Sequence, residues 1–166
     1  MDILLSSGMI LLFTSLELAV VSRLPLQNGI ADIVLLFVIA WSLNREAKNY
    51  YIPTLIAGGI TSFISSIPFP SAIVSYLLAA FMTRSLVKRL WEMPVFSMLI
   101  ITALATFTQH LIYILILQIQ GSNVPFLYSL EVITLPSVFI NIILALPVYL
   151  IVHDAQKMVY REVEYG

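Results

Sequence analysis

Long apolar segments dominate this chain, and most of its charged residues lie in the short stretches between them. Hydrophobic residues make up 60% of the sequence and charged residues 10%, whereas soluble domains carry about 25% charged residues. A soluble fold of 166 residues cannot hide so much apolar surface, because a small domain has a large surface for its volume. We therefore expect an all-α integral membrane protein, with lipid covering the apolar excess.

Six apolar stretches fit membrane-spanning helices, and together they predict one transmembrane domain over residues 1–166. The expected helices cover residues 3–21, 30–43, 52–67, 71–86, 95–117 and 132–152, followed by a short tail at 153–166. The second and third stretches are shorter than the about 20 residues that usually cross a bilayer. A re-entrant pair, which would leave five helices, therefore stays open. Residues 118–130 are expected to form a polar loop.

Lysine and arginine residues predict the orientation of these helices. With six crossings, only Arg23 falls on one side of the membrane, and all other basic residues fall on the opposite side. Those others are Arg45, Lys48, Arg84, Lys88, Arg89, Lys157 and Arg161. Because basic loops remain in the cytoplasm, we expect both termini there. The basic loop that contains Arg84, Lys88 and Arg89 is also a candidate for binding anionic headgroups or a cytoplasmic protein.

The third stretch carries small residues at intervals of four, at Thr54, Gly58 and Ser62. Small side chains at this spacing let two helix backbones approach closely in lipid. One interpretation is a docking face for the helix of a partner protein. The other, which we favour, is packing inside the bundle.

A polar stripe follows the fifth stretch, with His110 beside it: Thr102, Thr106, Gln109 and Tyr113. Polar groups are costly in lipid, so the stripe should face protein or a water-filled cavity. It could line a substrate site or hydrogen-bond to neighbouring helices, and we favour the second. Asn141 in the last stretch is expected to bond between helices in the same way. A histidine-based metal site is not expected, because His153 falls at the opposite membrane face.

Two carboxylates stand within or beside the apolar stretches, Glu17 and Asp32. An unpaired carboxylate in the outer half of the first helix is costly, so we expect Glu17 to pair with Arg23 or to be solvated. A proton or cation site is the alternative. Asp32 opens the second helix, where a carboxylate can accept from free backbone N–H groups.

Motifs that carry chemistry are missing from the sequence. It has no phosphate loop, nucleophile elbow, HExxH motif or cysteine, and no set of polar groups that would converge on one pocket. We therefore expect no enzyme activity and no cofactor. The net charge of −1 also gives no reason to expect a nucleic-acid partner.

Several landmarks follow one another in the order typical of the bacterial rod shape-determining MreD family. They are Glu17, the turn Leu24-Pro25-Leu26, the helix start Ala31-Asp32-Ile33-Val34-Leu35-Leu36, the glycines of Ala57-Gly58-Gly59-Ile60, and Asn141, Pro147 and Lys157. The chain resembles this family over nearly its whole length. It departs from the family pattern where Ser62-Phe63-Ile64-Ser65 lacks a common aspartate and where Pro68-Phe69-Pro70 replaces a common glycine.

The resemblance implies a non-enzymatic scaffold of the cell-elongation complex, in the bacterial plasma (inner) membrane. Such proteins bind the single-span protein MreC, and through it link the MreB cytoskeleton to peptidoglycan synthesis by RodA and its transpeptidase partner. The candidate partner-binding residues are Thr54, Gly58, Ser62, Glu17 and Arg23. The family is similar in fold to the S components of energy-coupling-factor transporters. A vitamin-binding S-like subunit, with a cavity lined by Glu17 and Gln109, is therefore the alternative.

Overall fold

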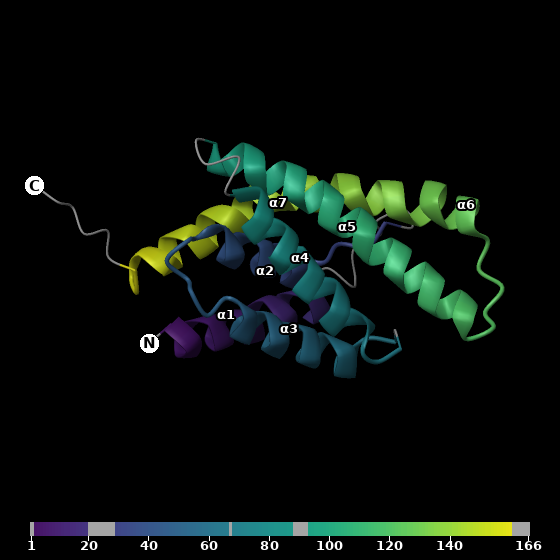
Figure 1. The fold of residues 1–166 in the computed structure, drawn as a ribbon, viewed down its shortest axis with the longest axis horizontal. Coiled ribbons are helices and arrows are strands. Elements are labelled where there is room, and N and C mark those ends of the chain that lie inside the picture. Colours follow the sequence, from purple (N-terminus) through teal and green to yellow (C-terminus); the bar gives the residue numbers. More distant parts are fainter. Residues whose placement is uncertain (1, 20–28, 67, 88–92, 161–166) are drawn as a thin grey trace, which may run out of the picture.

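The computed structural model describes residues 2–19, 29–66, 68–87 and 93–160, and these ranges are helical almost throughout (Figure 1). Five helices come first: α1 Asp2–Ala19, α2 Ile33–Leu43, α3 Tyr51–Ile64, α4 Ser71–Val87 and α5 Pro94–Ile119. The last helical segment combines α6 (Phe126–Ser129), a π-helical turn η2 (Leu130–Thr134) and α7 (Leu135–Lys157). The described ranges contain no strand, so the expectation of an all-α fold with six helical segments is confirmed.

Three of these segments are long and apolar enough to cross a membrane: α1, α5 and the continuous stretch Phe126–Lys157. The helices α2, α3 and α4 have 11, 14 and 17 residues. Since an α-helix rises about 1.5 Å per residue, each of them is shorter than a hydrocarbon core of about 30 Å. To cross a bilayer, these helices would need protein neighbours or a locally thinner membrane.

The shortest helix, α2, is the centre of the bundle. Every residue from Val34 to Ser42 is buried, and α2 packs against α1, α3, α4, α5 and α7. Its sequence is apolar on all sides, which is typical of a helix that other helices enclose. Protein therefore surrounds α2 along most of its length.

The outer surface of the bundle is apolar, while polar side chains lie inside it. Leu4, Phe63 and Ile119 are 80%, 84% and 85% exposed. Thr102 and Asn141, in contrast, are fully buried. Soluble proteins rarely expose this many large apolar side chains together, so the distribution favours a lipid environment.

The last helix is longer than the sequence suggested. We expected a loop up to residue 130 and a helix over 132–152, but the helical segment begins at Phe126 and continues to Lys157. The π-helical turn comes just before Pro136. Proline has no backbone N–H and clashes with the carbonyl one turn earlier, and a wider π turn relieves that clash. The other helix ends agree with the expected ones within a few residues.

Both described chain ends lie at one end of the bundle (Figure 1), and Arg45 and Arg84 lie at the same end. The Tyr160 hydroxyl lies 3.4 Å from the Asp2 carboxylate, so the two chain ends meet. The Arg45 guanidinium donates to the last carbonyl of α4 at 3.0 Å. From the end of α4, Arg84 reaches the loop between α2 and α3, where it donates to the Ala47 carbonyl. The other basic residues named above, apart from Lys48 and Lys157, lie outside the described residues.

Candidate functional site

Asp32 lies at the centre of a hydrogen-bond network inside the bundle. Its carboxylate caps α2 by accepting from the Leu35 N–H at 2.6 Å. The Tyr76 hydroxyl of α4 donates to it at 2.8 Å, and the Gln109 amide of α5 donates at 2.6 Å. Donors from three helices therefore meet one carboxylate, which is how a charged group can be held away from water.

Side chains of α7 hold the segment that precedes α2. Asn141 accepts from the Asp32 N–H at 3.0 Å, and Ser137 accepts from the Ile30 N–H at 2.8 Å. The Asn141 amide also donates to the Thr106 hydroxyl of α5 at 3.1 Å. Without these acceptors, the non-helical segment would present unpaired N–H groups to an apolar surrounding. Asn141 thus bonds between helices, as expected from its place in the sequence.

Gln109 and its neighbour His110 in α5 are turned toward protein. Gln109 and His110 are 2% and 9% exposed. Gln109 also donates to the Tyr113 hydroxyl at 3.0 Å, and His110 Nδ1 lies 3.2 Å from the Thr134 hydroxyl. Of the two expected roles for the polar stripe, hydrogen bonding between helices therefore fits these contacts.

Glu17 reaches the first turn of α2, where its carboxylate accepts from the Val34 N–H at 3.2 Å. Its expected partner Arg23 lies outside the described residues. Glu17 also lines a cavity of about 170 Å³ between α1 and the C-terminal end of α3. The other lining residues are Thr14, Leu18, Thr61, Ile64 and Ser65. Gln109 does not line this cavity. The two polar residues that a vitamin site would need in one place are therefore separate, and the cavity is below the about 300 Å³ typical of small-molecule sites.

The small residues of α3 that we considered for partner docking face α4. Thr54, Gly58 and Ser62 are buried, and a Cβ atom on Gly58 would lie 2.8 Å from the Ile73 Cα atom. At Gly58, therefore, α4 covers this face of α3. Close backbone packing inside the bundle, the other interpretation, explains the small side chains.

The neighbouring face of α3, one residue further around the helix, is open. A Cβ atom on Gly59 would meet no heavy atom within 4 Å. Leu55 and Phe63, four residues before and after it, are 45% and 84% exposed. We call these three residues the outer α3 face. The sequence did not distinguish the two adjacent glycines, because a glycine alone does not say which side of its helix is covered.

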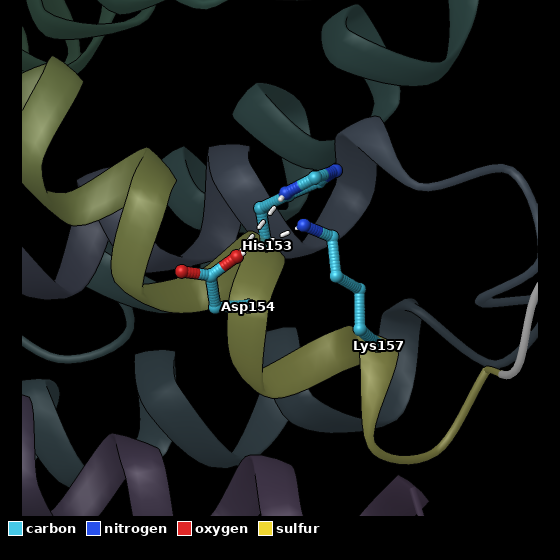
Figure 2. Close-up of polar contacts among 3 residues, drawn as sticks. All are labelled: His153, Asp154 and Lys157. Atoms are coloured by element: carbon cyan, nitrogen blue, oxygen red, sulfur yellow. Dashed lines mark hydrogen bonds and ion pairs between the residues drawn. The ribbon is translucent and has the colours of Figure 1, made fainter.

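Charged groups at the end of α7 lie beside a second cavity of about 310 Å³. Figure 2 shows His153 and Lys157 turned toward Asp154, with the Lys157 ammonium 3.1 Å from the carboxylate. This pair is exposed, and such pairs stabilise a fold only slightly. At the same end, burial and the carboxylate of Asp2 raise the pKa of Tyr160 to about 12, so its hydroxyl stays neutral.

Tyr76 is the site residue that reasoning from the sequence missed. Its side chain is fully buried, and its hydroxyl joins α4 to the start of α2. A tyrosine in the middle of an apolar stretch is a usable signal, since a buried hydroxyl requires a partner. The sequence could have identified this need but not the partner, which lies 44 residues away.

Comparison with known proteins identifies no relative of this chain. No family model, no curated protein and no solved structure matches the chain.

Proposed function

We propose that the chain is a non-enzymatic, MreD-like scaffold of the bacterial cell-elongation complex. In this role it binds an MreC-like single-span protein and links MreB indirectly to RodA and its transpeptidase partner. The sequence landmarks given above support the proposal. The observation that carries it is the pairing of Asp32, Tyr76, Gln109 and Asn141 with one another. Polar groups arranged in this way join helices, whereas a substrate site requires them to converge on an open pocket.

The proposal includes six membrane crossings with both termini in the cytoplasm of the cell. The contact between Tyr160 and Asp2 supports an even number of crossings, because it joins the two chain ends. Arg45 and Arg84 lie at the same end of the bundle, which agrees with the rule that basic loops remain inside. The inner membrane is the location that this orientation and the resemblance favour.

Single-cysteine labelling tests this topology directly, because the chain contains no cysteine. Asn49 and Ser122 are exposed residues in loops at the two ends of the bundle. We expect an impermeant maleimide to label Ser122→Cys in spheroplasts and to label Asn49→Cys only after the membrane is opened. Labelling of both variants from the same side would contradict six crossings.

The outer α3 face is the proposed contact for the partner helix. Gly59 leaves a gap between the exposed side chains of Leu55 and Phe63. In lipid, helices associate mainly through close packing, so a gap flanked by large side chains can receive a ridge of another helix. This face replaces the covered face at Gly58 as the candidate for binding MreC.

Filling the gap should therefore weaken the complex. We expect Gly59→Leu to lower co-purification with MreC about tenfold, which corresponds to about 1.4 kcal/mol. Membrane insertion should not change and thermal stability should not fall, because no neighbour lies near Gly59. Thr108→Leu is the matched control, since it adds a similar side chain to α5, away from the outer α3 face. If Gly59→Leu and Thr108→Leu retain the partner equally, this face is not the contact.

A further inference from the structure

We propose that the cavity beside Glu17 holds a monovalent cation, either Na⁺ or a proton, on the Glu17 carboxylate between α1 and α3. This cavity, called the Glu17 cavity below, is the one of about 170 Å³ described above. The inference goes beyond the scaffold function, because it assigns a ligand to a site that partner binding does not use.

Two helices supply oxygen atoms to this cavity with the same spacing. On α1 the lining residues are Thr14, Glu17 and Leu18, and around the end of α3 they are Thr61, Ile64 and Ser65. Residues three and four positions apart share one face of a helix, so each helix turns one side toward the cavity. Figure 1 shows α1 and α3 side by side, and the two helices are in contact. Carboxylate and hydroxyl oxygens are ligands that hard cations prefer.

The Thr14 hydroxyl has an unmet hydrogen-bonding capacity. The residue is only 8% exposed, and its Oγ1 atom has no hydrogen-bond partner among the described residues. Thr54 and Thr83, in contrast, donate to the carbonyl four residues earlier at 2.8 and 2.7 Å. A buried polar oxygen without a partner is unfavourable, and a bound ion or its water would satisfy it.

Charge gives the second reason for a cation. Glu17 and Asp32 accept from adjacent backbone N–H groups of α2, those of Val34 and Leu35, so two carboxylates share one helix end. Asp32 has side-chain donors from Tyr76 and Gln109 as well, whereas Glu17 accepts from backbone N–H groups in the first turn of α2. Two like charges in an apolar bundle repel each other, and neutralising one of them removes this cost.

The choice of a monovalent ion follows from the lining of the cavity. It contains one carboxylate and no lysine, arginine or histidine among the described residues. Calcium sites use several carboxylates, so one negative charge suits Na⁺ or a proton better. Thr61 also links the cavity to the inner network, because its hydroxyl lies 3.5 Å from that of Tyr76, which donates to Asp32. An ion at Glu17 therefore stabilises the contact of α1 with the rest of the bundle.

Thermal unfolding of the purified full chain in detergent tests the proposal. The midpoint temperature of unfolding is compared between Na⁺ and an organic cation at equal ionic strength. It is also measured over a range of pH. We expect the wild-type midpoint to rise by about 3 °C with the ion that binds. The titratable groups whose charges act on Glu17 are Asp32 at the start of α2, Tyr76 of α4 and Tyr113 of α5. Glu17→Gln should lose the response, while it keeps an acceptor for the Val34 N–H.

Further variants separate the two ions and provide the control. If Na⁺ raises the unfolding midpoint and Thr14→Val weakens this rise, the bound ion is Na⁺. If the midpoint depends on pH and only Glu17→Gln abolishes this dependence, the bound ion is a proton. Glu17→Asp has a shorter side chain, which withdraws the carboxylate from the cavity, so its midpoint should respond less to the ion. This variant replaces Glu17→Gln in the test if Glu17→Gln does not fold. Asp154→Asn, an exposed carboxylate at the other end of the bundle, should respond like the wild type. The proposal is overturned by a wild type that responds to neither ion, or by a Glu17 variant that responds fully.

Discussion

Gly58→Ala is expected to lower the free energy of unfolding by about 3 kcal/mol, because an added methyl group in a filled interface forces neighbouring atoms apart. The new Cβ atom would lie 2.8 Å from the Ile73 Cα atom, 3.3 Å from the Ile73 nitrogen and 3.4 Å from the Ala72 carbonyl oxygen. All three neighbours are backbone atoms of α4, so no side chain can rotate away. The helices α3 and α4 must instead separate along their contact. Unfolding in detergent, followed by circular dichroism, measures the loss.

The next residue supplies the control for this experiment. Gly59 has the same backbone environment in α3, but a Cβ atom there meets no heavy atom within 4 Å. Gly59→Ala should therefore be neutral, or stabilise the helix by up to about 1 kcal/mol through its higher helix propensity. A similar loss of stability at both positions would mean that α3 does not present Gly58 to α4. In that case the assignment of the outer α3 face would also fail.

The helices could be predicted from the sequence because lipid requires long apolar segments with internally paired backbones. This rule located all six helical segments, including α2 with only 11 residues. It did not locate the start of the last helix, since Phe126 and Leu127 follow a polar, proline-containing stretch. Composition indicates that an apolar segment starts there, but not that the helix has already begun.

The candidate site was less predictable, because its contacts join distant parts of the chain. Asp32 as a helix cap could be expected, since Leu35 is only three residues away. Its partners Tyr76 and Gln109 lie 44 and 77 residues away, and no local pattern relates them. Likewise, the spacing of Thr54, Gly58 and Ser62 predicted a tightly packed face but not which helix covers it. Periodicity therefore defines the faces of a helix, while the pairing of faces depends on the tertiary fold.

Asp32→Ala should be the most damaging change to a polar group in the chain. Losing the cap of α2 costs about 1 kcal/mol, and each buried donor left without an acceptor costs about 1–3 kcal/mol. The donors of Tyr76 and Gln109 would both lose their acceptor, so we expect a total loss of about 4 kcal/mol. Hydrogen bonds between membrane helices average only about 0.6 kcal/mol. Bonds to a carboxylate are stronger, however, and three of them end on this one.

Asp154→Ala measures what removal of a carboxylate costs when no buried donor depends on it. Asp154 is exposed, and its partner Lys157 can turn to water, so the loss should stay below about 1 kcal/mol. Asp32→Asn should fall between the two alanine variants, because its amide oxygen can still accept from the Leu35 N–H and the Tyr76 hydroxyl, while its NH₂ group cannot accept from Gln109. Unfolding midpoints of the three variants test this order. If Asp32→Ala were no more damaging than Asp154→Ala, apolar packing alone would hold α2 in place, and the polar network would be free to serve a ligand instead.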